Sequence, residues 1–298
     1  TAADVRGVED PETIMTGRNK LTVWEHCGLP VTEGQVRAGS CPSQELVDSY
    51  ETIDGEMPIL GYEDEDHLRP IINPKAVLYD ENNPFANRDP RLKASIYYNG
   101  APFQVGGDTY VWTFEGGNCA LSSTNRRNTR TGYYMRKFGN PTSNRANGNN
   151  DGYFRIFRLA ELYLNYAEAL NESDPGNPDI LIYANKARER SDVKMTPITD
   201  ASQDVLRERI RNERRVELAS EDHRLWDTRR WMTATTDLNS DLEGVEIQKN
   251  ESDGTFTYRK ISVEKRVFTP KMYFYPIPGS VILNEQVMAA GWAQNPLW

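Results

Sequence analysis

The spacing of apolar residues changes near residue 152, and the change separates two regions of different predicted structure. Before this point apolar runs are short, Gly and Pro recur, and no 3.6-residue period persists. After it, apolar residues recur with helical spacing on one face: Leu159, Leu162, Tyr163, Tyr166, Ala167 and Leu170. We therefore expect a loop-rich region with short strands over 1–152 and a helical region over 153–235.

Two segments of the first region alternate apolar and polar residues as strands do. Residues 92–98 alternate up to an Asn99-Gly100 turn, and Tyr110, Trp112 and Phe114 alternate in a second segment. The pattern predicts two strands in this region, the first of them running into a hairpin turn.

Two further helices are expected after the first. The break at 173–178 ends the first helix, and Asn177 and Pro178 are suited to start the second. The two form an antiparallel hairpin over 159–192, close to the roughly 34-residue period of a tetratricopeptide (TPR) unit. Ser202 is the predicted cap of a third helix, which should run towards Trp226 and Trp231.

The third helix carries eight charges between Arg207 and Glu217. Two interpretations are open: its arginines form a patch for an anionic ligand, or they pair with the acids interleaved among them. The interleaving favours internal pairing.

The region 236–298 is expected to pack on the helical core. Asp253-Gly254 is a strong hairpin turn signal between the segments 245–249 and 255–261. A polar β-hairpin followed by an aromatic C-terminal coil is therefore predicted.

Composition narrows the function classes. The chain has 298 residues, with 44 acids against 35 bases and a net charge of −9, which argues against nucleic-acid binding. No apolar run reaches the roughly 20 residues that a membrane-spanning helix needs. Three cysteines form no C-x-x-C pattern, and their roles stay open.

Few residues are suited to catalysis or metal binding. His223 and Asp227 lie one helical turn apart and could share a metal, but polar anchoring between helices is the favoured interpretation. Nucleophile elbows, phosphate loops and zinc helices are absent from the sequence. We expect no metal and no cofactor, although the two carboxylates of a glycosidase would leave no sequence pattern.

Aromatic residues in the loop-rich region are the candidate ligand contacts. Sugar rings present apolar C–H faces that pack on exposed aromatic rings. The predicted platforms have polar or Gly-rich neighbours that would leave a ring face accessible: Trp24, Tyr62, Tyr110 and Trp112. The alternative for each is a small core beneath the loops.

Five sequence blocks, in order, resemble the SusD/RagB family of outer-membrane nutrient-binding lipoproteins. The most distinctive is FRLAELYLNYAEALN at 157–171. The other blocks are PSQELVDSY with DG at 42–55, DPRL at 89–92, IRNERRVEL continuing to RRW at 210–231, and YPIP with QNPLW at 275–298.

The resemblance implies a mainly α fold of TPR-like hairpins with a loop-rich ligand face. It implies a non-enzymatic protein that captures a glycan, or in some branches a peptide, and passes it to a SusC-like TonB-dependent transporter. It also implies an N-terminal lipid anchor on the outer face of a Bacteroidetes outer membrane. Because family members are usually longer, the chain is expected to correspond to the C-terminal part of one. The arginines of 211–230 would then be scaffold, paired with Glu213, Glu217 and Asp227.

Four functions stay open in the sequence. Glycan capture is favoured; a peptide-binding RagB-like component and, less favoured, a glycan- or peptide-active enzyme on a helical scaffold are the alternatives. The chain could also serve mainly to dock a transporter.

Overall fold

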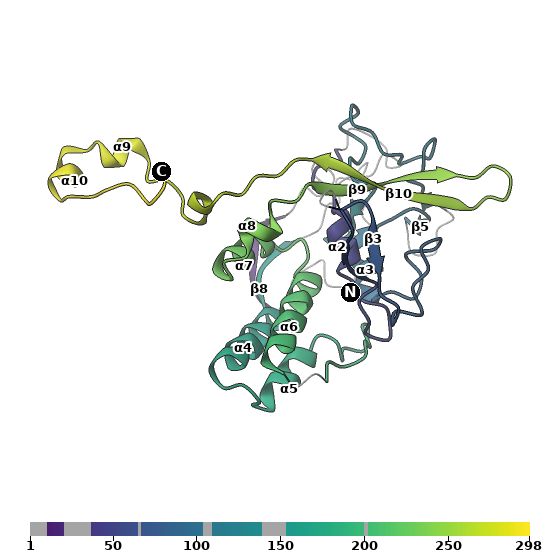
Figure 1. Ribbon diagram of the computed structural model, residues 1–298, viewed down its shortest axis with the longest axis horizontal. Coiled ribbons are helices and arrows are strands. Elements are labelled where there is room, and N and C mark those ends of the chain that lie inside the picture. Colours follow the sequence, from purple (N-terminus) through teal and green to yellow (C-terminus); the bar gives the residue numbers. More distant parts are fainter. Residues whose placement is uncertain (1–10, 21–36, 65–66, 104–108, 139–152, 200–201) are drawn as a thin grey trace.

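The computed structural model describes residues 11–20, 37–64, 67–103, 109–138, 153–199 and 202–298. In this part of the chain, longer helices occur only after residue 158, and every sheet consists of two antiparallel strands (Figure 1). The described helices also lack the length and apolar character that crossing a membrane requires.

Short elements separated by loops make up the first region. Its helices are α2 (Gln44–Asp48) and α3 (Pro90–Ser95). Its strands are β1 (Thr13–Lys20), β2 (Ile59–Tyr62), β3 (Pro70–Ile72), β4 (Ile96–Tyr97), β5 (Ala101–Pro102), β6 (Tyr110–Val111) and β7 (Tyr134–Met135). The pairs are β2 with β3, β4 with β7 and β5 with β6, while β1 pairs with β8 (Tyr153–Arg158).

The strand predicted over 92–98 is wrong for its first half. Asp89 caps a helix there, since its carboxylate accepts a hydrogen bond from the Arg91 backbone N–H at 2.8 Å, and Pro90 occupies the first turn. These start signals decide the local structure. The strand β4 begins only at Ile96, and it pairs with β7 and not across the Asn99-Gly100 turn.

The helical region follows the predicted order, with one break. The helices are α4 (Leu159–Ser173), α5 (Asp179–Asn185), α6 (Gln203–Glu217), α7 (Arg224–Arg230) and α8 (Ala234–Asp237). Ser202 caps α6 as predicted, and its hydroxyl accepts from the Val205 N–H at 3.4 Å. The expected continuation to Trp231 is interrupted, because Ser220 and Asp222 adopt left-handed backbone angles of 63° and 65°.

The predicted C-terminal hairpin is present. Strands β9 (Leu242–Lys249) and β10 (Phe256–Glu264) pair in antiparallel register, with Gly254 at φ 74° in the turn. An arm with η3 (Pro270–Tyr273), α9 (Gly279–Ile282) and α10 (Glu285–Ala289) extends away from the body (Figure 1). The side chain of Gln294 bridges the backbone N–H and carbonyl of Ile277, which joins the two ends of this arm.

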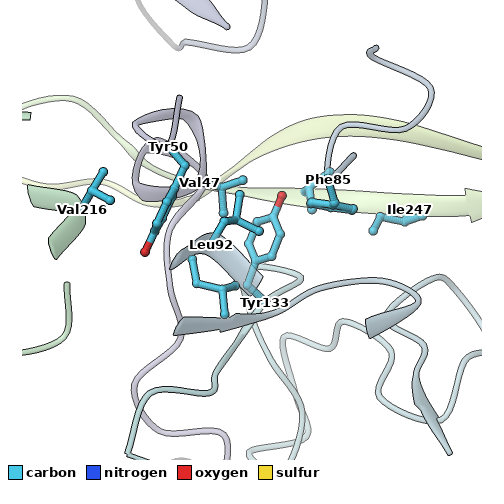
Figure 2. Packing of buried hydrophobic residues seen from close by; sticks show 9 residues of the cluster. Val47, Tyr50, Phe85, Leu92, Tyr133, Val216 and Ile247 are labelled. Carbon is cyan, nitrogen blue, oxygen red and sulfur yellow. The ribbon is translucent and has the colours of Figure 1, made fainter. Parts of the chain in front are cut away.

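Hydrophobic clusters hold the elements together, and two of them involve α6. One joins α2, α3 and β9 with the end of α6 and includes Val47, Tyr50, Leu92, Val216 and Ile247 (Figure 2). The other fills the space between α4, α5 and α6 around Ala167, Ile180, Ala184, Leu206 and Ile210.

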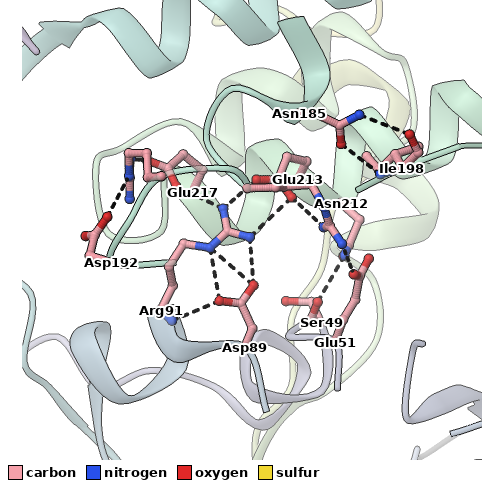
Figure 3. Close-up of polar contacts among 12 residues, drawn as sticks. Ser49, Glu51, Asp89, Arg91, Asn185, Asp192, Ile198, Asn212, Glu213 and Glu217 are labelled. Carbon is pink, nitrogen blue, oxygen red and sulfur yellow. Dashed lines mark hydrogen bonds and ion pairs between the residues drawn. The ribbon is translucent and has the colours of Figure 1, made fainter. Parts of the chain in front are cut away.

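A network of buried charges also connects the halves (Figure 3). Arg91 on α3 forms ion pairs with Glu213, with Glu217 at 2.9 Å and with its own cap Asp89 at 2.7 Å. Arg158 adds pairs of 2.7 Å to Glu217 and Glu221. The charges are tolerable in the interior because each carboxylate meets an arginine.

The partners of the α6 acids differ from those predicted. Glu213 and Glu217 pair with arginines on other elements and not with those of their own helix. Arg214 does pair with Asp227 at 3.1 Å, as predicted. Burial would raise the pKa of Glu217, but Arg158 and Arg91 outweigh it and hold that pKa well below the ordinary value.

Candidate functional site

Tyr110 and Trp112 lie side by side at the end of β6. Their ring centroids are 5.9 Å apart, and Tyr110 is 44% exposed. Asn118 fixes this segment: its carbonyl accepts from the Trp112 N–H at 2.9 Å, and its amide donates to the Tyr110 carbonyl at 2.9 Å. Because these bonds hold the backbone, the two rings form a pre-arranged surface.

Two further aromatic rings pack against Trp112. Phe256 on β10 stacks on it with a centroid distance of 5.8 Å, and Phe114 meets it edge-on at 5.9 Å. A Cβ at Gly100, where φ is 83°, would lie 3.4 Å from the indole ring, so glycine permits this close approach. We call Tyr110, Trp112, Phe114 and Phe256 the aromatic shelf.

Charged groups at the margin of the aromatic shelf are exposed. The Lys249 ammonium lies 5.9 Å from the Phe114 ring centroid, and Glu115 follows Phe114 in the chain. An ammonium and a carboxylate beside an aromatic surface are suited to bind sugar hydroxyls while the ring packs against C–H groups.

Tyr62 lies in a different environment from the other two described candidates. Its hydroxyl donates to Asp48 at 2.6 Å, and its ring is stacked on His67 at 4.4 Å. The Lys260 ammonium lies 4.3 Å from the same ring. Burial and the Asp48 carboxylate raise the pKa of Tyr62. Much of the ring surface is therefore already in contact with the protein.

One face of β10 contacts both Trp112 of the aromatic shelf and Tyr62. Phe256, Tyr258 and Lys260 alternate with exposed residues and point to the same side of the strand. Phe256 supports Trp112 and Lys260 contacts Tyr62, so roughly 13 Å of strand separates the two contacts.

A cavity of about 610 Å³ opens beside Tyr62, and we call it the α2–α7 cavity. Its lining combines charged and aromatic residues from distant segments: Glu45, Asp48, Tyr62, Arg215, Arg224 and Trp231. Its margin includes Leu60, which is 61% exposed, so the cavity reaches solvent.

The remaining predicted residues have simple placements. Trp24 lies outside the described residues. His223 approaches Glu161 of α4 at 3.5 Å, which is the anchoring between helices that was favoured, and Asp227 is occupied by Arg214 and Arg230. Among the described residues no group of three His, Cys, Asp or Glu side chains is placed to hold a metal.

The sequence interpretation missed Phe256, which belongs to the aromatic shelf, and Asn118, which holds the shelf's backbone in place. Phe256 stands in the predicted hairpin, but its pairing with Trp112 depends on a contact across most of the chain. Asn118 carried no signal beyond its place in a Gly- and Asn-containing turn.

Comparisons with known proteins match the chain to one family. The model of the SusD family matches residues 7–298. A SusD-like protein of Formosa agariphila is 38% identical over 113 residues, which cover 37% of this chain and 21% of that protein.

Solved structures show the same fold. A SusD-like protein from Bacteroides fragilis aligns over 100% of this chain and 57% of its own, with a TM-score of 0.78 and 23% identity. A SusD-like carbohydrate binding protein from the same species aligns over 92% of this chain and 53% of its own, with a TM-score of 0.67 and 28% identity. The chain thus spans little more than half the length of these two relatives.

Proposed function

Because the chain belongs to the SusD family, we propose that it binds glycans at the cell surface without chemically altering them. A similar structure carries the name of a SusD-like carbohydrate binding protein. The observation that carries the proposal in this chain is the aromatic shelf, in which Tyr110 and Trp112 present adjacent rings beside polar groups. We place the glycan there.

The geometry accounts for binding by ordinary physical terms. The apolar face of a pyranose ring would pack on Trp112 and Tyr110, and this packing removes apolar surface from water. Lys249 and Glu115 would bond hydroxyl groups at the edge. Because Phe256 and Asn118 hold the platform in place before the ligand arrives, little entropy would be lost in ordering it.

The finer parts of the proposal concern the assembled protein. We propose that the captured glycan passes to a SusC-like TonB-dependent transporter, and that the full protein is held on the outer membrane by a lipid. We also propose that the α4–α5 hairpin with α6 is part of a TPR-like array. Binding of the protein to a purified SusC-like transporter would test the first of these.

The central test compares Tyr110→Ala and Trp112→Ala with the parent. A glycan and peptide array identifies the tightest ligand, and calorimetry then measures its affinity for each variant. We expect each substitution to weaken binding by about 1–3 kcal/mol, as exposed hot-spot residues do. Trp112→Ala should also lower the melting temperature, since its ring packs on Phe256, whereas Tyr110→Ala should not.

Trp292→Ala is the matched control, because this tryptophan is 59% exposed on the C-terminal arm. Unchanged affinity in both shelf variants would show that the glycan binds at another site. A hit confined to peptides would favour the peptide-binding alternative, and new reducing ends after incubation with polysaccharide would favour the enzyme.

A further inference from the structure

The α2–α7 cavity contains an arginine that has no partner among the described residues. Arg215 on α6 is half-buried, lines the cavity, and makes no hydrogen bond or ion pair with any residue that the structure describes. Its neighbour in sequence, Arg214, is by contrast bonded to Asp227 and Asn165. A partly desolvated guanidinium without a nearby counter-charge is unfavourable, so the site favours an anion.

The acids around the cavity do not fill this role, because they are engaged by other cations. Glu45 pairs with Arg266, and Asp237 pairs with Arg224 at 3.1 Å. Asp48 is held by Lys260 and the Tyr62 hydroxyl. Asp222 is exposed at the margin and lies beyond ion-pair distance of Arg215.

The electrostatics of the second arginine agree with this geometry. Arg224 also lines the cavity, and burial together with the positive charge of Arg215 lowers its pKa to about 10. Burial lowers the pKa of Arg215 itself. Of the four arginines that line the cavity, Arg215 alone lacks a carboxylate partner among the described residues, and an added anion would relieve its repulsion with Arg224.

The remaining lining is suited to a sugar. Trp231 contributes aromatic surface, and Ser43 and Ser220 contribute hydroxyl groups. A volume of about 610 Å³ lies within the range of small-ligand sites, roughly 300–1,000 Å³. We propose that the α2–α7 cavity is a binding site for an acidic sugar, whose carboxylate or sulfate group pairs with the Arg215 guanidinium. That the anion belongs to a sugar rests on the proposed function; the anion site itself does not.

The test uses methyl glucuronide, glucose 6-sulfate and neutral methyl glucoside, titrated into the protein at low salt and followed by calorimetry. We expect at least one acidic sugar to bind and the neutral sugar to bind far more weakly. Arg215→Gln should weaken the acidic sugar about 10- to 100-fold, because charge-assisted bonds to a guanidinium are strong. Arg215→Lys should fall between, since it keeps the charge but loses the forked geometry.

Two controls separate this inference from the proposed glycan site. Arg259→Gln removes an exposed arginine that pairs with Glu246 on the hairpin, and it should change nothing. Trp112→Ala should leave binding of the acidic sugar intact while it weakens binding at the aromatic shelf. If glycan binds at the aromatic shelf but no acidic sugar binds in a way that depends on Arg215, only the cavity site is overturned.

Three results would overturn the inference. The first is equal affinity of the protein for neutral and acidic sugars. The second is binding of inorganic sulfate while no acidic sugar binds. The third is a marked fall in the melting temperature of Arg215→Gln. The last would show that Arg215 has a structural partner, whereas the geometry predicts a melting temperature equal to or above that of the parent.

Discussion

At the scale of single residues, Glu243 is the most unusual group. Its side chain is fully buried, and neither carboxylate oxygen accepts a hydrogen bond from a described residue. His67 Nδ1 lies 3.0 Å away without hydrogen-bond geometry. Burial, reinforced by the charge of Glu45, raises the pKa of Glu243 to about 8. Glu243 is therefore largely protonated in the folded protein at neutral pH.

This raised pKa predicts how stability depends on pH. Between about pH 4.5 and 8 the unfolded chain ionises Glu243 while the fold keeps it protonated, so its contribution to stability is lost as the pH rises. Glu243→Gln should match the parent near pH 4.5 and exceed its unfolding free energy by several kcal/mol at pH 9. Urea denaturation at several pH values measures this.

Glu246→Gln is the control for that comparison, since this acid lies on the same strand but pairs with Arg259 at the surface. It should leave the slope of stability against pH unchanged. Equal slopes for the parent and Glu243→Gln would show that Glu243 ionises in the fold as it does in the unfolded chain.

At the scale of elements, Arg214 joins three helices. It is 3% exposed on α6, binds Asp227 of α7 at 3.1 Å and donates to Asn165 of α4 at 2.6 Å. Arg214→Ala should cost about 3 kcal/mol or more of unfolding free energy, because it leaves buried Asp227 with Arg230 as its main counter-charge. Chemical denaturation of the variant and the parent gives this difference.

Arg207→Ala is the matched substitution on the same helix. Arg207 pairs with Glu172 and Asp204, which are 45% and 90% exposed, so its loss should cost less than about 1 kcal/mol. Similar losses for the two variants, or a loss of glycan affinity with normal stability in Arg214→Ala, would contradict the scaffold role of Arg214.

Elements were predictable where their signals are local. The spacing in α4 and the Ser202 cap of α6 determine those helices from short stretches of sequence. The failure at 92–95 has a local reason too, because the Asp89-Pro90 helix start signal overrides the alternation of apolar residues that follows it. In contrast, the aromatic shelf and the α2–α7 cavity unite segments far apart in the chain, such as Trp112 with Phe256. No local pattern in a single sequence marks such contacts between distant segments.

At the scale of the whole molecule, buried charges hold the loop-rich half against the helices. Arg91 reaches Glu213 across 122 positions of sequence (Figure 3). Arg188 connects Glu213 at 2.9 Å with Glu51 at 2.7 Å. Hydrophobic contacts across the same boundary involve Val216 with Tyr50 and Leu92 (Figure 2). Because both sets of contacts cross it, the halves should unfold together.

Acid titration tests this coupling. The pKa values of Glu213, Glu217 and Glu221 lie below the ordinary value because nearby cations, Arg91, Arg158 and Lys137, outweigh the effect of burial. The stability that these pairs provide is present above about pH 4.5 and is lost as the pH falls below it. Glu51 acts in the opposite sense, since burial outweighs Arg188 and raises its pKa, but it is one carboxyl against three.

We therefore expect the unfolding free energy to decrease by several kcal/mol between pH 4.5 and 2.5, with helix content and tryptophan fluorescence lost in one coincident urea transition. Glu217→Gln should have a lower unfolding free energy than the parent at pH 6. Its unfolding free energy should also fall less steeply in acid, because one of the three paired carboxylates is already absent. Added salt should change the decline little, since buried pairs are weakly screened. Separate transitions for the two signals would mean that the charges stabilise each half on its own and do not couple them.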